Sequence, residues 1–573
     1  MNNKIKELGF EKLVEFNNIY VNNNDIKYSD GDIEKTILNI LKKECGKTDN
    51  VFPLLEDHIE DWATEYHLSW VRQNILKPID FKKEDVVLEL GGGTGVISEY
   101  VVKRVQKLIT VEGTEIRAKS ISTRCQKHDN LDIIVANFLN LDLLSIFGEN
   151  SFNKILLIGV LEYVPKYAKN IDSDPINELL NVCEKLLKQG GELIIAIENK
   201  VGLKYLLGRE EDHLGQKHYG TQSLYKKNDV TTFTKKNLTN RLNNAGFIDI
   251  DTYYPFPDYK LPKVIIKEDF NLYDQESKTL ISSLLSGIKS RNYSGRFVEN
   301  LDEDRILNNF IEEEILGSVS NSFLFVANKK NNIKNEMTPF IYYFSSSRRY
   351  QYSNEMLFKN TNDGITVSKK WNGKNTEGNL LNLNVNNDYH YLLKDGEVLG
   401  NILNNCFLLN EKENYLRMLN RWIDFLIENI EDFENGFDLL PLNVICDKFD
   451  RLTFFDCDEW KTTKKISISQ IIARYVLTNM NHIEWLLGEE NNLENYVILI
   501  IGEREIKIDD LDKIEDIHKY ININILKKDY LSLNKVKLSN PENKNTIWKK
   551  WIKYLSPPIF FILKKKIIKI LSK

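Results

Sequence analysis

One glycine-rich stretch has the residue types and spacing to bind a nucleotide-like ligand. Residues 86–90 read Val-Val-Leu-Glu-Leu, and glycines follow with GxGxG spacing: Gly91, Gly93 and Gly95. An apolar strand, a tight glycine turn and a helix let the backbone approach a ligand closely. A dinucleotide turn would need glycine where this chain has Val96, and Glu89 would repel a pyrophosphate. The turn therefore favours a ligand with cationic or hydroxyl groups.

A carboxylate at the end of the next apolar run has the position to bind a ribose. Residues 107–112 read Lys-Leu-Ile-Thr-Val-Glu, which predicts a second strand that ends at Glu112. In doubly wound folds an acidic residue at this place accepts hydrogen bonds from ribose hydroxyls. Together with the glycine turn, Glu112 predicts a nucleoside-type ligand.

Residues 60–260 resemble class I S-adenosylmethionine-dependent methyltransferases. LELGGGTG (88–95) is similar to the first motif of this family, and TVEG (110–113) to its second. VANF (135–138) and ILLIGVLEYV (155–164) are similar to the segments beside the adenine and after the fourth strand. The resemblance implies an α/β, Rossmann-like sheet of seven strands with S-adenosylmethionine as the cofactor. The cofactor-binding residues that it implies are Glu89, Gly91, Gly93, Gly95, Glu112, Asn137, Phe138 and Gly159.

A narrower resemblance concerns the methyl acceptor. The segments AIENKVGLKYLLGREEDHLG (196–215) and YPFPDYKLP (254–262) are similar to bacterial methyltransferases of surface-polysaccharide (O-antigen, capsule) assembly. This resemblance implies an O-methyltransferase that acts on a sugar hydroxyl or sugar phosphate of a glycan or glycolipid. Glycosyltransferases of a polysaccharide assembly complex are the partners that it implies.

Methyl transfer to a hydroxyl requires an in-line arrangement and a group that removes the proton. We expect this base near the carboxyl ends of the fourth and fifth strands. His213 beside Asp212 is one candidate, because imidazole titrates near neutrality. Glu162 after the fourth strand is another, and Glu198 and Asn199 after the fifth are alternatives. Each of these side chains also has an ordinary structural role open to it.

Two kinds of base methylation are not expected from the loop after the fourth strand. The signature of methylation at the adenine amino group, Asp/Asn-Pro-Pro followed by an aromatic residue, is absent there. No Pro-Cys pair for methylation at pyrimidine carbon follows that strand either, and position 160 is Val160. The sequence therefore favours an oxygen acceptor.

Composition indicates a globular chain without an obvious polyanionic partner. The net charge is −6, from 77 basic and 83 acidic residues, so we expect no nucleic-acid partner. The six cysteines are scattered without CxxC spacing, which favours a reducing cytoplasm. Neither a signal peptide nor a long apolar span is recognisable in the sequence.

The order of periodic segments predicts several parts. Alternating strands and helices up to about residue 250 predict a parallel sheet, and residues 322–329 are the best candidate for an antiparallel seventh strand. A helix within 59–80 is placed to cover the cofactor, with Tyr66 and His67 in reach of the site. The predicted parts are a helical lead-in (1–58), a methyltransferase domain (59–335) with a helical cap insertion (258–320), a second domain (337–530) and a tail (545–573).

The second domain resembles aminoglycoside- and choline-kinase-like phosphotransferases over residues 437–460. The resemblance implies an α+β kinase-like domain with Asp438 as the base and with Asn443 and Asp456 as Mg²⁺ ligands. Lys370 is the candidate lysine for ATP. The histidine that usually precedes the catalytic aspartate and a glycine-rich phosphate loop are both missing, so ATP and Mg²⁺ are expected only if this domain is active.

The carboxy-terminal tail combines lysines with aromatic residues. Eight lysines and no acidic residue follow Trp548. Basic amphipathic helices with tryptophan suit an anionic membrane surface, so the tail predicts a peripheral position at the inner face of the plasma membrane. A docked terminal helix with a solvated lysine face is the alternative.

Three functions are compatible with these features. The first is an S-adenosylmethionine-dependent O-methyltransferase of a surface glycan or its precursor. The second is a bifunctional kinase and methyltransferase that phosphorylates and then methylates a glycan terminus to stop chain growth. The third is a non-catalytic membrane-surface scaffold, against which the glycine turn and Glu112 argue.

Overall fold

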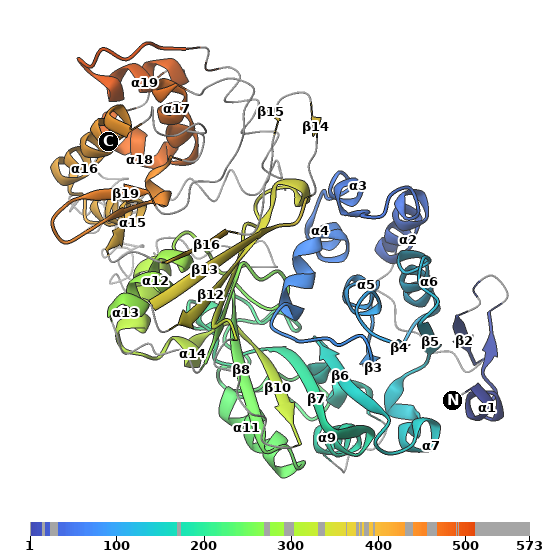
Figure 1. Cartoon of the computed structure of the whole chain (residues 1–573). Helices are drawn as coiled ribbons and strands as arrows, with labels where there is room; N and C mark the ends of the chain where they lie inside the picture. Colours follow the sequence, from blue (N-terminus) through green and yellow to red (C-terminus); the bar gives the residue numbers. More distant parts are fainter. Residues whose placement is uncertain are drawn as a thin grey trace, which may run out of the picture. The chain divides into compact units, whose positions relative to one another are not determined.

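A computed structural model of the chain describes most of its first 511 residues (Figure 1). The described residues are 2–13, 16, 18–22, 32–168, 174–268, 275–291, 303–329, 338–361, 364–373, 377–378, 381–382, 389–392, 396–429, 439–454, 467–488, 490, 492–509 and 511. The predicted tail (545–573) lies outside them. Among the residues that are described, no helix is both long and apolar enough to cross a membrane.

Five parallel strands form the centre of the main sheet. Each is a short run of apolar residues, which suits strands buried on both faces. In spatial order they are β5 (Leu131–Val135), β4 (Lys107–Glu112), β3 (Val86–Leu90), β6 (Phe152–Ile158) and β7 (Leu187–Glu198).

Two further strands complete the sheet of the class I methyltransferase fold, and one of them, β10, is antiparallel to the rest. Strand β10 (Ser322–Asn328) lies between β7 and β8 (Asp249–Phe256) and is antiparallel to both. The chain thus reaches the seventh strand of the fold only after the segment 258–320, as the sequence predicts. This strand order and direction confirm the predicted Rossmann-like methyltransferase fold.

Helices cover both faces of these strands (Figure 1). Alternate residues of β3 face opposite sides: Val87 packs in one apolar core, and Leu88 in another. The first core includes residues of α5 (Val96–Val102) and α6 (Glu115–Arg124). The second includes residues of the helices α7 (Leu143–Phe147), α9 (Pro175–Leu186) and α11 (Lys235–Asn244).

The sheet is larger than the seven strands that were predicted. Over the described residues it has fourteen strands. On one edge the additional strands are β1 (Glu11–Lys12) and β2 (Ile19–Val21); on the other they are β9 (Val264–Lys267), β11 (Ile341–Phe344), β12 (Asn354–Thr361), β13 (Gly364–Trp371) and β16 (Tyr389–Leu392). The lead-in is therefore not purely helical, and the sheet continues past residue 337. The sheet extends in this way because an open strand edge can pair with a further strand. On one side β2 pairs with β5 and β1 with β2, and on the other side β11 pairs with β9.

Helices precede, interrupt and follow the core strands. Before β3 the chain forms α1 (Asn2–Glu7), α2 (Asp32–Glu44), α3 (Phe52–Glu56), α4 (Trp62–Leu68) and η1 (Trp70–Leu76). Around the sheet's carboxyl edge lie η2 (Phe138–Asn140), η3 (Leu161–Tyr163), α8 (Val164–Tyr167) and α10 (Leu203–Leu206). Within residues 258–320 the structure has α12 (Gln275–Leu285), α13 (Glu303–Glu312) and α14 (Leu316–Val319), and η4 (Tyr350–Tyr352) follows β11.

The carboxy-terminal part of the described chain has its own apolar core, centred on Trp422. Its helices are α15 (Leu399–Leu408), α16 (Lys412–Asn429), η7 (Pro441–Asn443), α17 (Ile468–Thr478), α18 (Met480–Leu487) and α19 (Leu493–Ile501). Strands β17 (Glu397–Val398), β18 (Val444–Cys446) and β19 (Leu452–Phe454) form a small sheet, and β14 (Glu377–Gly378) pairs with β15 (Leu381–Asn382). Strands β18 and β19 pair antiparallel as a hairpin. The predicted domain limits stay predictions.

Candidate active site

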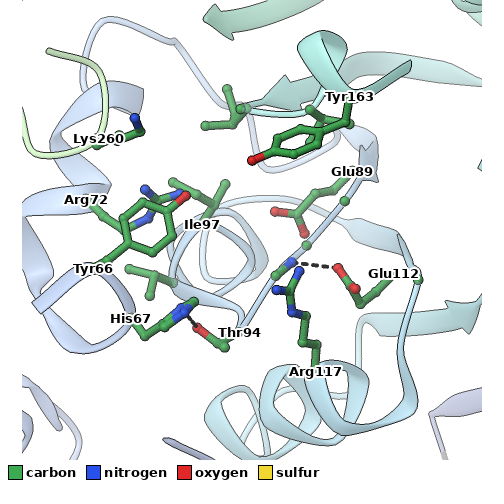
Figure 2. Close-up of a pocket in the computed structure, with 18 of the residues that line it drawn as sticks. Tyr66, His67, Arg72, Glu89, Thr94, Ile97, Glu112, Arg117, Tyr163 and Lys260 are labelled. Atoms are coloured by element: carbon green, nitrogen blue, oxygen red, sulfur yellow. Dashed lines mark hydrogen bonds between the residues drawn. The ribbon is translucent and has the colours of Figure 1, made fainter. Parts of the chain in front are cut away.

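A cavity of about 450 Å³ opens at the carboxyl edge of the parallel strands (Figure 2). Most of the residues predicted to bind the cofactor line it: Glu89, Gly91, Gly93, Glu112, Asn137, Phe138 and Gly159. Parallel strands end at the same edge of a sheet, and ligands of open α/β folds bind there. Gly95 does not line the cavity and has a structural role instead.

The glycine turn needs backbone conformations that glycine adopts without strain. Gly91, Gly93 and Gly95 have φ angles of +83°, +54° and +87°. At Gly95 an added Cβ would lie 2.9 Å from the Cα of Ile121, so this glycine allows α5 and α6 to pack closely. At Gly93 an added Cβ would meet no atom within 4 Å, because this glycine borders the cavity.

Glu112 connects the second strand to the glycine turn. Its Oε2 accepts a hydrogen bond from the backbone N of Gly93 at 2.8 Å, and its Oε1 accepts one from the N of Thr114 at 3.2 Å. Burial raises the pKa of Glu112, while the nearby Arg117 opposes the shift. The carboxylate is thus held at the cavity wall, where it suits the predicted ribose contact, which stays a prediction.

Glu89 at the end of β3 is buried beside the same turn. Its Oε2 accepts hydrogen bonds from Ser98 Oγ at 2.6 Å and from Thr110 Oγ1 at 2.8 Å. Burial raises the pKa of Glu89 to about 7, and these two hydroxyls limit the shift. The charge of Glu89 therefore changes near neutral pH.

We expect the affinity for S-adenosylmethionine to fall as the pH drops below about 7. The raised pKa of Glu89 leaves it protonated below that value and ionised above it. The cationic cofactor favours the ionised form, so Kd should rise by at most about tenfold per pH unit on the acid side and level off above pH 8. Calorimetric titration from pH 6 to pH 8 measures this slope. The Glu89→Gln variant should lack it, and an equal slope in that variant would contradict the assignment.

Arg72, which the sequence motifs do not indicate, lines the cavity from η1. Its guanidinium stacks on the Tyr66 ring (Figure 2) at 3.8 Å from the ring centroid, and its buried Nη1 has no hydrogen-bond partner. Guanidinium groups bind carboxylates in a fork geometry, and S-adenosylmethionine carries one carboxylate. The sequence signal is an arginine that directly follows the apolar Trp70 and Val71 in the predicted lid helix.

Replacing Arg72 with glutamine is expected to weaken the binding of S-adenosylmethionine by about 10- to 100-fold, because one charge-assisted hydrogen-bonding group is lost. Adenosine has no carboxylate, so its affinity should not change. Arg104→Gln is the matched control: Arg104 also stacks on a tyrosine, with 3.6 Å between the guanidinium and the ring centroid of Tyr100, but it does not line the cavity. Equal losses for both ligands would show that Arg72 only stabilises the fold.

Tyr66 and His67 of α4 also line the cavity, which is where the sequence placed a lid helix. His67 Nδ1 lies 3.1 Å from Thr94 Oγ1. Burial lowers the pKa of His67 to about 3, so this imidazole is neutral at physiological pH. His67 is thus placed to position the glycine turn through Thr94.

The predicted catalytic residues gather on the opposite side of the cavity. His213 and Asp212 line it, whereas Glu162 lies beneath the wall and is fully buried. His213 Nε2 lies 3.5 Å from Glu198 Oε2, while Asp212 pairs with Lys204 and Lys260. Although Asp212 is next to His213 in the sequence, its carboxylate pairs with these two lysines and not with the imidazole.

The electrostatics of this cluster differ from residue to residue. Burial raises the pKa of Glu162 to about 8, and the charge of Glu198 adds to the shift. Burial would lower the pKa of His213, but Glu198 outweighs it and raises the value to about 9. Burial opposes ionisation of Glu198 as well, yet Lys260 holds its pKa well below the usual range. The catalytic roles of His213, Asp212 and Glu162 stay predictions.

Two of the four residues predicted for a kinase-like site are described. Lys370 is exposed on β13, and Asn443 is half-buried at the end of η7. Asp438 and Asp456 lie outside the described residues. A kinase-like domain with ATP and Mg²⁺ therefore stays a prediction.

Comparisons with known proteins agree on the class of enzyme. The family described as ribosomal RNA adenine dimethylase matches residues 69–172. The chain is 21% identical over 247 residues to ribosomal RNA small subunit methyltransferase A of Mycoplasma capricolum, covering 40% of this chain and 82% of that protein. It is 30% identical over 139 residues to the protein of the same name from Francisella tularensis subsp. novicida, covering 22% and 50%. These matches confirm an S-adenosylmethionine-dependent methyltransferase.

Solved structures give matches of low overall similarity. One is an S-adenosylmethionine-dependent methyltransferase from Thermotoga maritima, a possible histamine N-methyltransferase, with a TM-score of 0.27, 17% identity and coverage of 47% of this chain and 93% of that chain. Another is phosphoethanolamine N-methyltransferase 2 from Haemonchus contortus in complex with S-adenosyl-L-methionine, with a TM-score of 0.27, 17% identity and coverage of 45% and 52%.

The comparisons contradict two predictions about the acceptor. The glycan acceptor with its glycosyltransferase partners is wrong, because the matching family and the named relatives methylate ribosomal RNA. The prediction of no nucleic-acid partner is wrong for the same reason. The net charge of a whole chain does not determine the electrostatic potential around one site, and for this reason the net charge of −6 was a poor guide to a nucleic-acid partner.

Proposed function

We propose that this chain transfers the methyl group of S-adenosylmethionine to RNA. The observation that carries the methyl-transfer part is the cavity in which the glycine turn, Glu112 and the unpaired Nη1 of Arg72 converge. They offer a close backbone, a ribose acceptor and a carboxylate partner, which are the contacts that this cofactor needs. The RNA part rests on the named relatives.

The acceptor side of the cavity is compatible with a planar base. Tyr163 and Tyr167 line it, and the Tyr163 ring packs edge-on against His213 with 5.2 Å between the centroids. Enzymes that act on a nucleobase hold it outside the stack between aromatic side chains. The loop after β6 reads Gly159-Val160-Leu161-Glu162 and does not contain the Asp/Asn-Pro-Pro signature of methylation at the adenine amino group. The proposal therefore names RNA as the acceptor and does not specify the atom that is methylated.

The test is methyl transfer from S-adenosylmethionine with a labelled methyl group to an in-vitro transcript of small-subunit ribosomal RNA, free and assembled with ribosomal proteins. We expect label in the RNA, and nucleoside analysis then identifies the base and atom. If the protein binds the cofactor by calorimetry but labels neither form, RNA is not the acceptor. If it does not bind the cofactor, the methyltransferase assignment itself is wrong.

A further inference from the structure

Three metal-ligating side chains meet beneath the acceptor side of the cavity. Glu162 is in η3 after β6, Glu198 ends β7, and His213 lies in the loop after α10. One carboxylate oxygen of each glutamate and a ring nitrogen of His213 all lie within 4.8 Å of one another. Two atoms that bind one ion at the usual distance of about 2 Å lie at most about 4 Å apart, so side-chain movements of less than about 1 Å would close this cluster around an ion.

The cluster leaves buried polar atoms without partners. Glu162 is fully buried, and neither of its carboxylate oxygens has a hydrogen-bond partner in another residue. His213 Nε2 also lacks a hydrogen bond, and its distance to Glu198 Oε2 is a long 3.5 Å. A buried polar group without a partner is costly, and native structures rarely leave one. A bound cation between these atoms would satisfy them.

The charges around the cluster point to a divalent ion. Its acidic residues are the buried Glu162, Glu198 and Glu211 and Asp212, whose side chain is 6% exposed, and its ammonium groups are those of the buried Lys204 and Lys260. Both lysines are already paired, Lys204 with Asp212 at 2.7 Å and Lys260 with Glu198 Oε1 at 2.6 Å. With His213 neutral and the carboxylates ionised, as metal binding requires of its ligands, the acidic groups exceed the basic ones by two charges.

We propose that Glu162, Glu198 and His213 bind one divalent cation of the first transition series, such as Mn²⁺ or Zn²⁺. An imidazole with two carboxylates suits these ions better than Mg²⁺ or Ca²⁺, which prefer oxygen ligands alone. The surroundings fit this role. Tyr163 Oη lies 3.1 Å from Nδ1 of His213 and orients the ring, as outer groups do at metal sites. Lys260 holds the other oxygen of Glu198.

The test uses the full-length chain after removal of metal by chelation, without cofactor or RNA, so that its outcome is independent of the proposed function. Titration with Mn²⁺, followed by the electron paramagnetic resonance signal of the free ion, should show one ion per chain. Electron spin echo spectra should show modulation from an imidazole ¹⁴N. Glu162→Gln should weaken binding by about tenfold or more, and His213→Gln should also remove the ¹⁴N modulation.

Glu56→Gln is the matched control, because Glu56 is another buried glutamate with an unpartnered carboxylate oxygen and lies outside the cluster. Its Mn²⁺ affinity should equal that of the wild type. Circular dichroism checks that each variant is folded, and His213→Gln carries the test if Glu162→Gln is not. The proposal would be overturned if the chain binds neither Mn²⁺ nor Zn²⁺ saturably, or if neither cluster variant weakens the binding. Protonation of the cluster's own side chains would then balance its charge.

Discussion

Replacing Glu112 with alanine is expected to reduce the affinity for S-adenosylmethionine by at least about 100-fold, to the limit of calorimetric detection. The substitution removes the predicted acceptor of the ribose hydroxyls, and each lost charge-assisted hydrogen bond is worth about 1.5–3 kcal/mol. It also frees the backbone N of Gly93, which Glu112 Oε2 binds at 2.8 Å. Both the ligand contact and the conformation of the turn therefore depend on one carboxylate.

A comparison of ligands separates these two contributions. The wild type should bind adenosine more tightly than 2′-deoxyadenosine, and Glu112→Ala should bind both equally weakly. Glu112→Gln keeps one acceptor oxygen and should show an intermediate loss. Asp132→Ala is the control, because Asp132 lies on the neighbouring β5, pairs with Lys107 at 2.8 Å and does not line the cavity. Continued preference for adenosine in Glu112→Ala would mean that the ribose lies elsewhere.

The central strands and the cofactor side of the cavity could be predicted because their signals are local. An apolar run, positive-φ glycines and an acid at a strand end are adjacent in sequence, so each motif carries its own geometry. The seventh strand was predictable at a distance, because residues 323–327 are all apolar and the fold requires an antiparallel strand between β7 and β8.

The edges of the sheet were not predictable for a physical reason. Backbone hydrogen bonds are alike for every strand, so an open edge accepts whichever strand the packing brings to it. Ile19–Val21 and Ile341–Phe344 were too short or too distant to indicate that they pair with β5 and β9. The extent of the sheet was therefore underestimated on both sides.

Side-chain contacts that depend on the tertiary structure could not be predicted either. Arg72 is held in the cavity by stacking on the ring of Tyr66. The sequence gives no sign that these two side chains are in contact. His213 follows Asp212 in the chain but contacts Glu198, which belongs to a different strand. The acceptor was misjudged because the narrower resemblance lies in residues 196–262, whereas the family that matches covers residues 69–172.

Replacing Gly93 with valine is expected to abolish cofactor binding without unfolding the protein. An added Cβ at this position meets no protein atom within 4 Å, so the side chain would enter the space of the cavity. Valine at a φ of +54° costs about 1–2 kcal/mol, which lowers Tm by only a few degrees. A methyl-bearing branch in the ligand's place should reduce affinity by at least about 100-fold, as measured by calorimetry.

The matched control for this substitution is Gly190→Val. Gly190 has a φ of +77°, and an added Cβ there also meets nothing within 4 Å, but the residue lies in the exposed turn of β7 outside the cavity. The two variants should share a similar loss of Tm, because they carry the same backbone strain. Only Gly93→Val should lose S-adenosylmethionine, since only its side chain displaces the ligand. If both variants bind the cofactor as the wild type does, the glycine turn does not contact it.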